Sequence, residues 1–347
     1  MASEPHRHLG PEPTCPPPDS NPTKSRITLP LGKLLMTRLL AAALVFASPL
    51  PAVAAEQIKL VVPFAAGGPV DLVARTIAAE LPARLNTDVI IENRGGAGGI
   101  IGTELVAKSA PDGRTLLQAS LGSHVLSAAL RPQLSYDPIK SFTPLAFVGV
   151  VPSLLVVSAQ SKIGSLADLL AEAKQKALSY GSAGPGTTMN IAAELFNAVT
   201  GIKTTHVPYR GAGPALNDLL GGHLDLIIAD TPVLLPLVNT NAVRPLALLA
   251  TERSPLIPTV ATTAQLGYPE IVMENWYGMF GPAGLTPSVR TTLEKAILEV
   301  LASPVVKERF AAGGLQGARD SEGFRARLAS DVAYWGQEVK RLGISAE

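Results

Sequence analysis

The sequence has very little cysteine, almost no excess charge and no long hydrophobic run beyond its N-terminal region. Cys15 is the single cysteine among 347 residues, which excludes a disulfide framework and a zinc or iron–sulfur site built from several cysteines. The 29 Lys and Arg residues are balanced by 28 Asp and Glu residues, so no general attraction for nucleic acid is expected. No apolar stretch after the N-terminal region reaches the roughly 18 residues of a membrane span.

Motifs of the common enzyme classes are also missing. The chain has no G-x-x-x-x-G-K-[ST] phosphate loop, no G-x-S-x-G nucleophile elbow and no H-E-x-x-H zinc motif. The run 95–102 (GGAGGIIG) resembles a dinucleotide-binding loop, but it follows the second predicted strand, not the first. No strand-end acid lies about 20 residues further on, as such a loop requires. These absences predict a protein without catalytic residues, cofactor or metal.

Residues 1–35 are polar and rich in proline, a composition that cannot build a packed core. We therefore expect a disordered leader in front of the folded protein. Met36 by itself would start a normal signal peptide, so two start sites, Met1 and Met36, are consistent with the sequence.

The segment 36–55 has the features of a secretory signal peptide in the right order. Arg38 supplies a positive charge, residues 39–46 are apolar, and alanines at 52 and 54 form an A-x-A cleavage site. The alternative is a transmembrane anchor, which is disfavoured because the apolar run is too short to cross about 30 Å of hydrocarbon. The sequence thus predicts an exported protein that is cleaved near Ala55.

From residue 58 onward, short runs of β-forming residues alternate with helical patterns. Strands are predicted at 58–63, 88–92, 115–119, 146–150, 154–158, 178–181, 204–208, 224–229 and 244–250. Helices are predicted at 71–85, 101–109, 166–176, 188–200, 215–220, 233–238, 288–302, 305–312 and 322–342. The segment 276–286 (WYGMFGPAGLT) is predicted to be a loop-like or extended break. The alternation predicts an α/β fold with mostly parallel, buried strands.

Four predicted strands end in small residues and lead directly into a helix with proline at or near its first position. These junctions are 64–69 (FAAGGP), 182–187 (SAGPGT), 210–214 (RGAGP) and 230–232 (DTP). Free N–H groups at a helix start bind anions, and glycine lets a ligand approach the backbone. Loops at the carboxyl edge of an α/β sheet form its ligand site. Any one of these turns can be purely structural, but four together predict an anion-binding cleft.

Side chains in these junctions have structural and ligand-binding interpretations. Asp71 is expected to accept hydrogen bonds from backbone N–H groups at its helix start, rather than bind a ligand ammonium. Thr187 and Thr188 are candidates both for N-cap residues and for ligand contacts. Asp230 ends an apolar strand and fits either a structural turn or a ligand contact.

Motifs with a consistent order run through the chain from residue 58 onward. They are IKLVVPF (58–64), GGPVD (67–71), AR (74–75), IENRGGAGG (91–99), PDG (111–113), YDP (136–138), YGS (180–182), ELF (194–196), HVPYRG (206–211), PA (214–215), DLLGG (218–222), WYG (276–278) and PAG (282–284). Together they resemble the tripartite tricarboxylate transporter substrate-binding family, the Bug (Bordetella uptake gene) receptors. The resemblance covers essentially all of 56–347.

This resemblance implies a type II periplasmic-binding-protein fold with two α/β domains around a ligand cleft. Domain 1 would comprise 56–153 plus 273–347, and domain 2 would comprise 154–272. The implied function is that of a monomeric periplasmic receptor that binds a small organic acid and delivers it to the large and small membrane subunits of a transporter. Two alternatives are a ligand sensor that signals through a membrane partner and a secreted α/β hydrolase.

By the same resemblance, a carboxylate ligand would be held largely by backbone groups of the cleft loops. The chain departs from the common family form P-G-G-G-T-D at Val70, and it has Asn190 where histidine is frequent. The candidate ligand-binding residues are Phe64, Ala66, Gly67, Gly68, Ser120, Ser123, Ser182, Gly184, Gly186, Thr187, Thr188, Tyr209 and Asp230.

Overall fold

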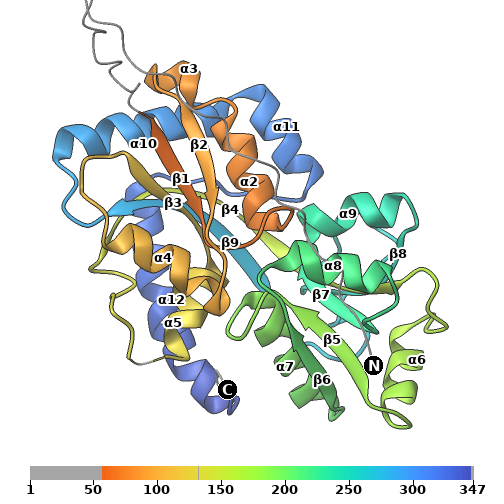
Figure 1. Ribbon diagram of the computed structural model, residues 1–347. Helices are drawn as coiled ribbons and strands as arrows, with labels where there is room; N and C mark the ends of the chain where they lie inside the picture. Colours follow the sequence, from red (N-terminus) through yellow and green to blue (C-terminus); the bar gives the residue numbers. More distant parts are fainter. Residues whose placement is uncertain (1–56, 132, 345–347) are drawn as a thin grey trace, which may run out of the picture. The chain divides into compact units, whose positions relative to one another are not determined.

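The computed structural model describes residues 57–131 and 133–344 (Figure 1). The predicted leader 1–35 and signal peptide 36–55 lie outside the described residues. The strands are β1 (Ile58–Val62), β2 (Val89–Asn93), β3 (Thr115–Ser120), β4 (Phe142–Ser158), β5 (Leu178–Ser182), β6 (Thr204–Pro208), β7 (Leu226–Asp230), β8 (Val243–Leu249) and β9 (Glu274–Pro282). They form a sheet in the order β2-β1-β3-β9-β4-β7-β5-β6, with β8 also paired to β4.

Helices connect the strands and cover both faces of the sheet (Figure 1). The longer ones are α2 (Pro69–Ala78), α4 (Ile100–Ala107), α6 (Leu166–Ala173), α7 (Thr188–Thr200), α8 (Ala212–Leu220), α9 (Thr231–Asn239), α10 (Pro287–Ala302), α11 (Pro304–Ala312) and α12 (Ser321–Arg341). The short ones are α3 (Pro82–Leu85), η1 (Ala97–Gly99), η2 (Gly122–Leu126) and α5 (Ser127–Ala129). None of the helices in the described ranges is both long and apolar enough to cross a membrane.

The long strand β4 joins two groups of strands. Up to Pro152 it pairs antiparallel with β9, and from Ser153 onward it pairs antiparallel with β7 and β8. The outer pairs β1/β2, β1/β3, β5/β6 and β5/β7 are parallel, as the sequence predicts. The prediction of mostly parallel strands is wrong for the centre of the sheet, where β4 and β9 pair antiparallel with each other and with β3, β7 and β8. The two strands predicted at 146–150 and 154–158 are continuous in β4 because backbone pairing extends across Pro152. The predicted division into domains stays a prediction.

The segment 276–286 begins inside strand β9 and not in a loop. β9 runs between β3 and β4, and all of its residues except Glu274 are buried. Trp276 and Phe280 point into one half of the core with α12, whereas Tyr277 and Met279 point into the other half with α10. Because both faces are covered, the strand has no alternation of apolar and polar residues. The extended alternative is therefore correct up to Pro282.

Helix starts follow the proline and N-cap signals of the sequence. Pro69, Pro287 and Pro304 occupy the first helical turn of α2, α10 and α11, where the missing N–H would have no intrahelical partner. Thr187 and Asp320 cap α7 and α12 through side-chain oxygens. The sequence therefore specifies locally where these helices begin.

Candidate functional site

The β1–α2 and β5–α7 loops are closed by the same kind of hydrogen bond. The Gly67 N–H donates to Asp71 Oδ2 at 2.9 Å, and the Gly186 N–H donates to Asn190 Oδ1 at 2.9 Å. Both glycines have positive φ, 84° and 80°, a conformation that favours glycine. The expectation that Asp71 accepts from the backbone is confirmed. These two N–H groups are used within the protein, so other donors must bind any ligand.

Asp71 is a buried carboxylate that also fixes the neighbouring strand. It accepts from Arg75 Nε at 2.8 Å and from Asn93 Nδ2 at 2.9 Å. Burial by itself would raise the pKa of Asp71, but hydrogen bonds from Arg75, Gly67 and Asn93 outweigh it and hold the pKa below its ordinary value. Asn93 Nδ2 also donates to the Phe64 carbonyl. The ionised carboxylate therefore holds the loop in a fixed shape.

Several loops enclose a small space, here called the inner cavity, of about 20 Å³. This volume is enough for about one water molecule. Its walls come from the β1–α2 loop, the end of β3, the β5–α7 loop, the start of α8, the end of β7 and the start of β9. The lining residues are Phe64, Gly68, Pro69, Val70, Ser120, Gly122, Ala183, Thr187, Thr188, Met189, Ala212, Asp230 and Asn275. None of these lining residues is a lysine or an arginine.

The inner cavity brings together six of the candidate residues. These are Phe64, Gly68, Ser120, Thr187, Thr188 and Asp230. The first turns of α2 and α7 both line it, through Val70 and Met189 among others. First-turn N–H groups lack an intrahelical partner and attract anions. Two helix starts thus converge on one enclosed space.

The other seven candidates do not line the inner cavity. Gly184 and Tyr209 instead line an outer groove of about 760 Å³, together with Gly95–Gly98, Ile101, Pro185, Pro208, Arg210 and Pro214. Ser123 supports Ser120, because its Oγ accepts from the Ser120 N–H at 3.0 Å. Ala66, Gly67 and Gly186 belong to the loops around the cavity and Ser182 ends strand β5, but none of the four is among the lining residues of the cavity. Asn275 is a lining residue that sequence reasoning missed, because no local motif marks it.

Ser182 and His206 have the separation of a nucleophile and a base. Ser182 Oγ lies 2.6 Å from His206 Nε2, a pair that no sequence motif indicates. However, the Ser182 hydroxyl is fully buried. It also accepts from the Gly184 N–H at 3.0 Å and lies 3.2 Å from the Gly184 carbonyl. These contacts tie the β5–α7 loop to β6.

Loops from the two strand groups are bonded directly to each other. Ser127 Oγ donates to the Gly98 carbonyl at 2.7 Å and to the Gly186 carbonyl at 3.2 Å. The Ala65 N–H donates to the Arg210 carbonyl at 3.1 Å. A Cβ on Gly98 would lie 2.4 Å from the Pro185 carbonyl oxygen. The glycine run 95–99 therefore permits close approach of the two loops, which accounts for its composition without a nucleotide.

Asp230 and Asn275 meet at one wall of the inner cavity. Asp230 accepts from Asn275 Nδ2 at 2.6 Å, from Ser153 Oγ at 3.4 Å and from the Tyr277 hydroxyl. Burial raises the pKa of Asp230, although these three hydrogen bonds act in the opposite direction. The side chain of Asp230 thus bonds to β4 and β9 and also lines the cavity.

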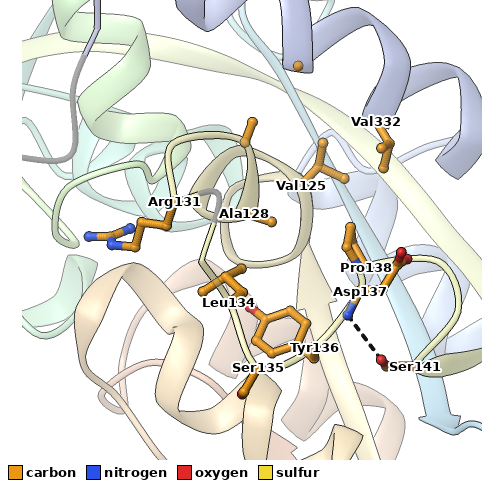
Figure 2. Close-up of a pocket in the computed structure, with 12 residues that line it drawn as sticks. Val125, Ala128, Arg131, Leu134, Ser135, Tyr136, Asp137, Pro138, Ser141 and Val332 are labelled. Carbon is orange, nitrogen blue, oxygen red and sulfur yellow. Dashed lines mark hydrogen bonds between the residues drawn. The ribbon is translucent and has the colours of Figure 1, made fainter.

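A further pocket has a volume of about 570 Å³, and Figure 2 draws the residues that line it. It is lined by residues of η2 and α5, by residues 134–138 with Ser141, and by α12. The Asp137 N–H donates to Ser141 Oγ at 3.0 Å on its rim. None of the candidate ligand-binding residues lines this pocket.

We expect Thr187 to stabilise α7 as its N-cap. Its Oγ1 accepts from the Asn190 N–H at 3.4 Å and donates to the Gly184 carbonyl at 2.7 Å. Thr187→Ala should lower the free energy of unfolding by about 1 kcal/mol, because a cap is lost. Urea denaturation measures this loss. Thr187→Ser keeps the hydroxyl and should retain most of the stability; an equal loss in both variants would contradict the capping role.

The fold and its loops define a solute-binding protein of the periplasmic-binding-protein class, with two α/β domains. BugD, a periplasmic binding protein, is similar with a TM-score of 0.80 and 31% identity over 83% of this chain and 98% of its own. Rpa4515 of R. palustris, solved with adipate, gives a TM-score of 0.79 and 32% identity over 83% and 98%. MatC of Rhodopseudomonas palustris, solved with malate, has a TM-score of 0.76 and 32% sequence identity, and the match covers 81% of this chain and 98% of MatC.

The family model of the tripartite tricarboxylate transporter family receptor matches residues 73–344. The chain therefore belongs to this receptor family. The predicted fold class and the predicted family are both confirmed.

Proposed function

We propose that this protein is a periplasmic receptor that binds a small organic carboxylate in the inner cavity and delivers it to the membrane subunits of a tripartite tricarboxylate-type transporter. The observation that carries the proposal is the convergence of the α2 and α7 helix starts on one enclosed cavity. No lysine or arginine lines that cavity, so the anion is bound by uncharged donors, namely backbone N–H groups and the hydroxyls of Ser120, Thr187 and Thr188. The malate and adipate bound to MatC and Rpa4515 support the same ligand class.

Ligand entry requires the loops to separate. A cavity of about 20 Å³ is far smaller than a four-carbon dicarboxylate. The contacts of Ser127 with Gly186 and of Ala65 with Arg210 would break as domain 1 (56–153 and 273–347) swings away from domain 2 (154–272). β4 changes pairing partners between Pro152 and Ser153, which favours a hinge there. Closure would exclude water and strengthen the hydrogen bonds to the anion.

The proposed location is the periplasm. The predicted signal peptide 36–55 supports export with cleavage near Ala55. The family and the similarity to the periplasmic protein BugD support the same compartment. A monomer is proposed, and the sensor alternative differs only in the membrane partner that recognises the closed protein.

A thermal-shift screen with mono-, di- and tricarboxylates tests the binding function. A carboxylate present at 100 times its dissociation constant should raise the free energy of unfolding by about 2.7 kcal/mol. The ligand should be recovered chemically unchanged, as mass spectrometry checks. Consumption of the ligand would support the hydrolase alternative, and Ser182 and His206 would then be the candidate nucleophile and base. Failure of every carboxylate to stabilise the protein would contradict the proposal.

Variants of the loops identify the groups that hold the anion. Gly186→Val should lose most affinity, because a Cβ there lies 3.1 Å from the Ser127 Cα and hinders closure. Gly67→Val places its Cβ in open space but strains a backbone with φ of 84°, so we expect a loss of affinity there as well. Arg210→Ala is the control, because Arg210 lines the outer groove and not the cavity. A larger loss in Arg210→Ala than in both valine variants would indicate ion pairing instead.

A further inference from the structure

One wall of the inner cavity presents hydrogen-bond acceptors and no charged donor. Asp230 and Asn275 both line the cavity, and their exposed fractions are 2% and 1%. Residues of the first turns of α2 and α7 also line the cavity, and helix starts of this kind provide N–H donors for a carboxylate. The cavity therefore has hydrogen-bond acceptors on one wall and hydrogen-bond donors on another.

Asn275 has an acceptor without a partner. Its Nδ2 donates to Asp230 Oδ2 at 2.6 Å, which orients the amide, while its buried Oδ1 has no hydrogen-bond partner among the described residues. Buried polar atoms are almost always paired, and an unpaired one calls for a specific explanation. Because Asn275 lines the inner cavity, a ligand donor group there would supply the missing partner.

Asp230 is surrounded by neutral groups. Its hydrogen-bond donors are Tyr277, Asn275 and Ser153, and neither lysine nor arginine is among the residues that line the cavity. Asp230 also stands at the N-cap position of α9, where the helix dipole favours a negative charge, yet its side chain makes no capping hydrogen bond. A buried carboxylate with neutral donors alone gains most from a further donor, above all a charged one.

We propose that the ligand carries a hydroxyl or ammonium group on its carbon chain in addition to the carboxylate, and that Asp230 and Asn275 bind this donor group. The inference rests on the proposed function and narrows its ligand class to hydroxy and amino acids with an acidic chain. Asp230 and Asn275 would then be the residues that determine specificity, while the helix starts bind the carboxylate that all candidate ligands share.

Succinate, malate and aspartate test the inference with the purified protein. The three share one four-carbon dicarboxylate skeleton and differ by a hydrogen, a hydroxyl or an ammonium at one carbon. Adipate, 2-hydroxyadipate and 2-aminoadipate form a second set for a longer site. Calorimetric titration should show at least tenfold tighter binding of a donor-bearing member than of its unsubstituted parent. Comparison of the hydroxy acid with the amino acid in each set identifies whether the site binds a hydroxyl or an ammonium group.

Two variants assign the preference to the acceptor wall. Asp230→Asn and Asn275→Leu should bring the donor-bearing acid to within about threefold of its parent, because the parent makes no use of the acceptors. Asp225→Asn is the matched control, since its carboxylate accepts from Ser179 outside the cavity. This variant should keep the wild-type ratio between the affinity for the donor-bearing acid and the affinity for its unsubstituted parent. Circular dichroism checks that each variant is folded.

The outcomes separate this inference from the proposed function. Equal affinities within each set in the wild type would overturn the donor preference and leave carboxylate binding intact. A preference that survives in folded Asp230→Asn and Asn275→Leu would overturn the assignment to these residues. Absence of binding by every carboxylate would count against the proposed function itself. If one variant fails to fold, the wild-type ratio and the other variant still decide.

Discussion

Replacing Gly278 with alanine should lower the free energy of unfolding by about 3 kcal/mol, because the core above this glycine has no room for a methyl group. A Cβ at Gly278 would lie 2.1 Å from Phe324 Cζ. The Phe324 ring cannot move aside easily, since it is fully buried with its centroid 5.2 Å from Trp276 and 4.7 Å from Phe280. Chemical denaturation with fluorescence detection measures the loss.

A double-mutant cycle tests the proposed cause. Phe324→Ala should cost about 3–5 kcal/mol through the cavity it leaves. In the double variant the methyl group introduced by Gly278→Ala enters space that the ring has vacated, so the combined loss should fall short of the sum by about 1 kcal/mol or more. Gly336→Ala in α12 is the control, because a Cβ there meets no atom within 4 Å, and it should be neutral or slightly stabilising. Strict additivity would show that Gly278 and Phe324 do not compete for space.

Acid should destabilise the protein through His124 by about 3 kcal/mol between pH 6.5 and pH 4. Burial lowers the pKa of His124 from 6.5 to about 4, although its hydrogen bond with the Pro138 carbonyl, at 2.7 Å, opposes the shift. The unfolded chain takes up a proton as the pH falls through 6.5, whereas the folded protein does so only near 4. The contribution of His124 to the free energy of unfolding is therefore fully present above pH 6.5, and it falls by about 1.4 kcal/mol per pH unit down to about pH 4.

His124→Phe should remove this part of the pH dependence. The ring stacks on Phe280 with centroids 4.1 Å apart, a contact that phenylalanine can keep. Urea unfolding at pH 7 and at pH 4 measures the difference in stability, which should shrink by about 3 kcal/mol in the variant. His223→Gln removes an exposed imidazole and serves as the control. An unchanged pH dependence in His124→Phe would show that other groups cause the acid destabilisation.

Features that depend on neighbours along the chain were predictable from the sequence. Asp71 bonds Gly67 four residues away, and Thr187 caps the N–H of Asn190 three residues away. Such bonds follow from residue type and spacing at a helix start, whatever the rest of the protein does. The same holds for the proline-initiated helices and for the alternation that predicts an α/β fold. The motifs of the loops were sufficient to identify the family, which the family model confirms.

Features that depend on distant partners were decided by the tertiary structure. The strand β9 has no alternating pattern because helices cover both of its faces. It pairs antiparallel with β3 and β4, whereas the sequence predicted mostly parallel strands. Asn275 reaches the cavity because β9 places it beside Asp230, 45 residues away in the chain. The sequence alone determined that strand-to-helix loops with small residues and a proline surround the site, since such turns depend only on neighbouring residues. Which side chains face the inner cavity depended on strand order and register, because these join segments whose separation along the chain carries no local signal.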